Sequence, residues 1–169
     1  GYQWKADGNA IAGATGSTFT LTQAQVGKTI TVVAGYTDQQ GTAESVTSVG
    51  TAAVANVNDV PTGAVNISGM ATQGQVLTAS NTLADADGLG AIAYQWKADG
   101  TSIAGATGTT YTLTQSEVGK TITVVASYTD QQGTFESVES AAAAAVANVN
   151  RAPTGTVSLS LPTRDLMVL

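Results

Sequence analysis

Apolar and polar residues alternate with a period of two in a series of short segments, a pattern typical of β-strands that bury one face. Glycine-rich turns separate these segments, and Thr and Val, which suit a pleated surface, are abundant in them. One helical turn is expected at QSEVGK, residues 115–120. From residue 59 onward the pattern predicts strands at residues 63–68, 75–81, 91–97, 102–104, 109–114, 121–128 and 134–149.

The chain repeats itself at a fixed offset of 92 residues. The motif YQWKADG occupies residues 2–8 and 94–100, and GKTITVVA occupies residues 27–34 and 119–126. Of the 58 positions that the offset aligns, 45 are identical, and no insertion separates the copies. Self-similarity at a fixed period indicates a protein built from repeated units in series.

The repeat divides the chain into three parts. Residues 59–150 form one complete unit, residues 1–58 form a partial unit that lacks the first two strands, and residues 151–169 begin a third unit. Because Gly1 falls inside the repeating pattern, we read the chain as a piece of a longer protein. Seven short strands per complete unit, one of them carrying Trp96, indicate an all-β fold: immunoglobulin-like β-sandwich repeats in tandem.

Alternation also predicts which aromatic side chains form the core. We expect Tyr94 and Trp96 to point inward, and Tyr128 and its counterpart Tyr36 to pack in the core or at a corner. The Ala-rich run at residues 141–147 fits a helix by propensity. The first copy has VGTAAVA at the equivalent positions, however, and we therefore interpret both stretches as strand.

Composition narrows the possible functions. Charged residues make up 11% of the chain and the net charge is −6, which argues against nucleic acid as a partner. The absence of Cys and His removes disulfides, thiolate sites and the commonest general base. No run of about 18 apolar residues occurs, so we expect no membrane insertion. Asp85 and Asp87 share one short exposed loop without an apolar pocket, so we expect no enzyme activity.

Four aspartates are nevertheless expected to lie together at one end of the complete unit. The segment LADADGLG, residues 83–90, places Asp85 and Asp87 two positions apart. If the strands run alternately up and down, this loop lies at the same end as Asp59 and Asp130. Calcium takes about six to eight oxygen ligands from carboxylates, carbonyls and waters. We therefore expect calcium at the junction between units, with Asn58, Asp59, Asp85, Asp87 and Asp130 as candidate ligands. A polar loop that uses Asp only for turn formation is the alternative.

Taken together, several motifs resemble the tandem immunoglobulin-like, cadherin-like extender repeats of giant bacterial surface adhesins, including those of the RTX and biofilm type. The motifs are DADGLG, YQWKADG, YTLTQSEVGK, SYTDQQGT and the boundary VNDVPTG. The resemblance implies a secreted protein at the bacterial cell surface, whose repeats hold a binding domain away from the cell and are stiffened by calcium at their junctions. Arg151 stands where the preceding boundary has Asp59, which departs from this pattern.

We accordingly expect a structural extender that supports cell adhesion and biofilm formation, with neighbouring repeats of the same chain as its partners. A glycan- or protein-binding module that uses its end loops is the alternative. The partial unit leaves its core, including Trp4, open on one side, which favours association. In the final segment Val157, Leu159 and Leu161 alternate with polar residues, as a strand donated to another copy would require.

Overall fold

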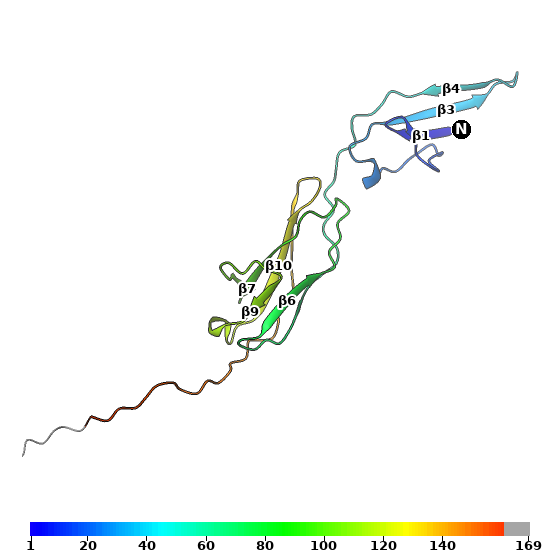
Figure 1. Cartoon of the computed structure of the whole chain (residues 1–169). Helices are drawn as coiled ribbons and strands as arrows, with labels where there is room; N and C mark the ends of the chain where they lie inside the picture. The colour runs from blue at the N-terminus through cyan, green and yellow to red at the C-terminus, as the bar shows by residue number, and fades with distance from the viewer. Residues whose placement is uncertain (161–169) are drawn as a thin grey trace, which may run out of the picture.

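The computed structural model describes residues 1–160 of the chain. Figure 1 shows an elongated arrangement in which two β-sheet units follow one another and an extended segment leaves the far end of the second unit. Strands of the first unit fall within residues 2–47, and strands of the second unit fall within residues 65–139. All strand pairings are antiparallel, and the prediction of an all-β fold is confirmed.

Two sheets make up the second unit. One has the order β11-β10-β7-β8 and the other the order β5-β6-β9. A 3₁₀ turn, Gln115–Glu117, follows β9 where QSEVGK predicted a helical turn. The strand bounds are β5 Val65–Ser68, β6 Val76–Asn81, β7 Ala93–Ala98, β8 Thr101–Ser102, β9 Thr110–Thr112, β10 Ile122–Thr129 and β11 Phe135–Glu139.

The inward faces of these two sheets enclose one hydrophobic core, so the second unit is a β-sandwich. Side chains from both sheets contribute to this core, and its largest fully buried members are Trp96, Leu77, Leu113, Ile122 and Val124. The prediction that the aromatic side chains of β7 and β10 point into the core is confirmed. Trp96 and Tyr128 are buried, and Tyr94 is half-buried against the same core.

The last predicted strand, at residues 134–149, is wrong beyond Glu139. The following run still accompanies β10, because the N–H groups of Ser140, Ala143 and Val146 donate to carbonyls of Val124, Ile122 and Lys120. Each step of three residues along the run therefore matches a step of two residues along the segment 120–124, and this mismatch interrupts a regular ladder.

Beyond that run the chain turns to the segment that joins β5 to β6. Ala147 forms a parallel bridge with Thr72, its N–H donates to the carbonyl of Ala71, and its carbonyl accepts from the N–H of Gln73. These bonds fasten residues 71–73 to the end of the second unit.

The first unit is a single sheet with the order β2-β1-β3-β4. It corresponds through the repeat to the β8-β7-β10-β11 sheet of the second unit. Residues 1–58 contain no counterpart of β5 or β6, and the residues equivalent to β9 form no strand. Tyr36 is 64% exposed, so the prediction that it packs in a core or corner is wrong. The elements are β1 Tyr2–Ala6, β2 Asn9–Ala10, the 3₁₀ turn Gln23–Gln25, β3 Ile30–Thr37 and β4 Ala43–Thr47.

The extended segment at the end of the described chain, residues 151–160, forms no strand, and every residue in it is exposed. The predicted start of a third unit falls partly in this segment, and Leu161 lies outside the described residues.

Candidate functional site

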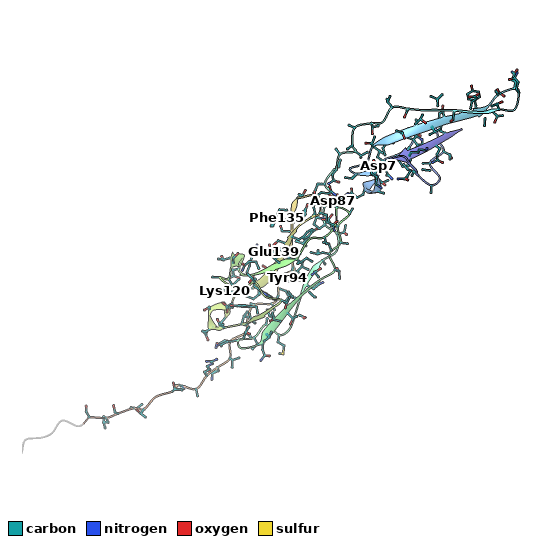
Figure 2. The ribbon with its side chains drawn as sticks, turned by 45° about the horizontal axis from the view of Figure 1, so that its top comes forward. Asp7, Asp87, Tyr94, Lys120, Phe135 and Glu139 are labelled. Atoms are coloured by element: carbon teal, nitrogen blue, oxygen red, sulfur yellow. The ribbon has the colours of Figure 1, made fainter. Side chains whose placement is uncertain are left out.

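Three segments distant in sequence meet at the end of the second unit that faces the first unit (Figures 1 and 2). They are the linker before Asp59, the loop that carries Asp85 and Asp87, and the turn after β10. The N–H of Asp59 donates to Asp87 Oδ2 at 2.7 Å. The N–H of Gln131 donates to the carbonyls of Asp87 and Gly88 at 3.3 and 3.2 Å. The predicted meeting of the boundary with these two loops is therefore present.

Asp85 has a structural role in its loop. Its Oδ1 accepts from the N–H of Asp87 at 2.8 Å, and its Oδ2 accepts from the hydroxyl of Tyr128. Burial raises the pKa of Tyr128 well above its ordinary value, and the hydrogen bond to the Asp85 carboxylate raises it further. Tyr128 is thus a neutral donor near neutral pH that ties the loop to β10, and both Asp85 oxygens already have a donor.

Asp87 is the central residue of the junction. Only 2% of it is exposed, so the expectation of a short exposed loop is wrong at this position. The loop folds inward because Asp87 Oδ2 receives the linker N–H of Asp59 while its carbonyl receives the N–H of Gln131. Gly88, at φ +91°, permits this turn, and a Cβ there would come within 2.6 Å of the Gln131 side chain.

Asp130 forms the turn after β10 and is also buried, at 5% exposure. Its Oδ1 accepts from the N–H groups of Gln132 and Thr134 at 2.8 and 2.7 Å. The equivalent Asp38 in the first unit accepts the same pair of bonds from Gln40 and Thr42. Asp130 and Asp38 therefore hold the same turn in both copies.

Three buried acceptor oxygens, one in the linker and two in the loops of the second unit, have no hydrogen-bond donor: Asn56 Oδ1, Asp87 Oδ1 and Asp130 Oδ2. They are the only such side-chain atoms found among residues 1–160. Buried polar groups in proteins are nearly always paired, since leaving one unpaired costs about 1–3 kcal/mol. Two of the three belong to carboxylates, whose negative charge attracts a cation. All three atoms that could ligate a metal are oxygens, which suits calcium or magnesium rather than a softer metal.

The predicted ligands are not all brought together. Asn58 and Asp59 are exposed, and the Asn58 amide donates to Glu136 Oε1 at 2.8 Å. Within residues 1–160 no group of three or more His, Cys, Asp or Glu side chains lies close enough to hold a metal ion. An ion bound here would therefore take Asp87 and Asp130 as its carboxylate ligands and complete its shell with amide, carbonyl and water oxygens.

Asn56 was missed by sequence reasoning. It belongs to AVANVN, which occurs in both copies, and its counterpart Asn148 is exposed. The sequence repeats this motif in both copies, but it gives no reason to expect different roles for Asn56 and Asn58. Asn56 is half-buried in the structure, whereas its neighbour Asn58 is exposed.

Comparison of the chain with protein-family models, with curated proteins and with solved structures finds no match. Among the described residues, no helix has the length and apolar character needed to traverse a lipid bilayer.

Proposed function

We propose that the chain is an extender segment of a secreted bacterial cell-surface adhesin, in which immunoglobulin-like units in series support adhesion and biofilm formation. The elongated arrangement in Figure 1 supports this proposal, because units placed end to end gain length per residue. The linker also has a defined contact with the second unit, because the side-chain amide of Asn58 donates to Glu136 and the N–H of Asp59, the next residue, donates to Asp87.

A divalent cation, calcium in extracellular conditions, is proposed to stiffen this junction. The observation that carries the proposal is the set of buried acceptor oxygens without donors on Asn56, Asp87 and Asp130. One residue comes from the linker and two come from loops of the second unit, so an ion that bound all three would restrict rotation between units. Extracellular modules bind calcium with Kd on the order of 10⁻⁴ to 10⁻³ M.

The test is calorimetric titration of the full chain with calcium, paired with small-angle scattering in calcium and in chelator. We expect binding near millimolar concentration and a narrower distribution of maximum dimensions with calcium. Asp87→Asn and Asp130→Asn are expected to weaken binding by at least about tenfold, because each removes a carboxylate charge from the ion.

Asp38→Asn is the matched control, since Asp38 forms the same turn in the first unit without a neighbouring loop. It is expected to bind calcium like the unmodified chain. Heats of dilution alone, with superimposable scattering profiles in calcium and chelator, would contradict the proposed stiffening.

A further inference from the structure

Glu136 places a further carboxylate at the end of the second unit that faces the first. It lies on β11 directly opposite Tyr128 of β10, and residues opposite one another in a ladder carry their side chains on the same face. That face is the inward one, because Tyr128 is buried and Val138, two residues after Glu136, packs against the core. Glu136 is accordingly half-buried.

The side chains near Glu136 include other carboxylates. Asp130 follows Tyr128 by two residues and is buried, and the Tyr128 hydroxyl donates to Asp85. Burial raises the pKa of the Tyr128 hydroxyl, and the hydrogen bond to Asp85 raises it further. The charges of Asp85, Glu136 and Asp130 also raise this pKa, so all three carboxylates lie near one hydroxyl.

No lysine or arginine balances this negative charge. In the part of the chain that the structure describes, the one salt bridge joins Lys97 to Glu139, at 3.2 Å. Asp87 and Asp130, which are 2% and 5% exposed, each keep a buried oxygen without a donor. Carboxylates held close together repel one another unless a positive charge neutralises them. The surroundings of Glu136 therefore favour a bound cation.

Only one oxygen of Glu136 is engaged. Its Oε1 accepts from the side-chain amide of Asn58 at 2.8 Å, and among the described residues no donor reaches Oε2. Asp59, the next residue of the linker, donates its N–H to Asp87 at 2.7 Å. Glu136 can thus offer Oε2 to an ion while Oε1 keeps its bond to the linker.

We propose that Glu136 is a third carboxylate ligand of the junction cation, together with Asp87 and Asp130. This inference rests on the cation proposed above. The Glu136 side chain must rotate toward the other two, because within residues 1–160 no three acidic side chains lie close enough to hold an ion. A third carboxylate favours a divalent ion over sodium or potassium. Because Asn58 holds the same carboxylate, the ion would fix the linker as well as the two loops.

Calorimetric titration of the full chain carrying Glu136→Gln tests this proposal. We expect calcium affinity to fall by about three- to tenfold, since one carboxylate charge is lost from the ion. The new amide keeps an acceptor oxygen for Asn58, so the contact with the linker is retained. Circular dichroism in chelator checks that the variant folds like the unmodified chain.

Glu139→Gln is the matched control, because it removes the same charge from the same strand. Glu139 is exposed and accepts from Thr123 and Lys97, away from the junction carboxylates. It is expected to bind calcium like the unmodified chain. Equal loss of affinity in both variants would reflect net charge alone and would overturn the proposal.

The outcomes also separate this inference from the proposed cation itself. Affinity that falls in Asp87→Asn but stays unchanged in Glu136→Gln would overturn the role of Glu136 and leave the cation in place. Absence of calcium binding by the unmodified chain would overturn both.

Terbium provides a second readout, because it replaces calcium at oxygen sites and emits when a nearby aromatic side chain absorbs light. We expect Tyr128→Phe to remove most of this emission at saturating terbium, since the Tyr128 hydroxyl lies beside the carboxylates. Glu136→Gln is expected to raise the terbium concentration at half-saturation by a similar three- to tenfold, about as for calcium. Emission that does not depend on Tyr128 would place the ion elsewhere and would overturn the proposal.

Discussion

Residues that are identical in the two copies differ in what surrounds them, and their roles differ accordingly. Tyr128 is buried and donates to Asp85, whereas Tyr36 projects into solvent because the first unit has no loop opposite it. Asp130 and Asp38 form the same turn, but only Asp130 has a buried second oxygen. The repeat therefore provides an internal control for substitutions at the 58 positions that the offset aligns.

Tyr128→Phe is expected to destabilise the second unit by about 1.5–3 kcal/mol, because a buried hydroxyl-to-carboxylate hydrogen bond is lost. Tyr36→Phe is expected to change stability by less than about 0.5 kcal/mol, as for a typical surface substitution. Urea denaturation of both variants measures the difference. Equal effects would show that the hydroxyl of Tyr128 contributes nothing specific.

Glu117 makes one unit sensitive to acid. Its carboxylate accepts from the N–H and the hydroxyl of Thr114, both at 2.8 Å, while Gln25 makes the equivalent bonds to Thr22. Burial opposes ionisation of Glu117, but the hydrogen bonds from Thr114 outweigh it and lower its pKa below the ordinary 4.5.

A lowered folded-state pKa means that this stabilisation is present above the unfolded pKa and is lost as pH falls through the folded pKa. We expect Glu117→Gln to lower the urea midpoint at pH 7 modestly, by a fraction of the roughly 1 kcal/mol that a helix cap provides. The difference from the unmodified chain is expected to shrink as the pH falls below 4.5 and the Glu117 carboxylate becomes protonated. A difference that stays constant with pH would refute the role of the carboxylate charge.

At the scale of elements, the presence of a partner decides whether a sequence forms a strand. Residues 110–112 form β9 because β6 pairs with them, whereas the equivalent residues 18–20 form no strand. Alternation predicted the strands of the second unit well because each buries one face against a partner sheet. The prediction from alternation failed after Glu139. There, every three residues of the run match two residues of the neighbouring segment, and the run leads to the bridge with residues 71–73. Neither feature is visible in the pattern of apolar and polar residues.

For the candidate site, the location could be predicted from the sequence but the hydrogen bonding could not. The alternating direction of the strands brings Asp59, Asp87 and Asp130 to one end of the second unit, and this could be predicted from the sequence. The sequence does not show which carboxylate oxygens accept hydrogen bonds. Those bonds come from backbone N–H groups, namely those of Asp59, Asp87, Gln132 and Thr134.

Leu113→Ala is expected to destabilise the second unit by about 2–5 kcal/mol, because it opens a cavity beside Leu77 and Trp96. Leu21→Ala, at the equivalent position, is expected to cost about 1 kcal/mol or less, since the side chain is already 47% exposed. Thermal denaturation of each variant measures both effects. Comparable losses would show that the side chain of Leu21 is buried in solution.

At the scale of the whole molecule, the partial first unit and the complete second unit bury very different amounts of core. The core cluster of fully buried residues lies entirely in the second unit. We expect scanning calorimetry of dilute chain to give two transitions, with the first unit melting at least about 10 °C lower. A single cooperative transition would show that the units stabilise one another across the junction.

The bonds between residues 71–73 and Ala147 have a mechanical consequence. Tension along the chain would enter the second unit near Asp59 and leave it near Asn150, at opposite ends of the sandwich. The two bridged segments run parallel, so this load would shear their hydrogen bonds together instead of peeling them apart one after another. A unit fastened in this way would resist stretching until both hydrogen bonds ruptured, as the proposed extender would require.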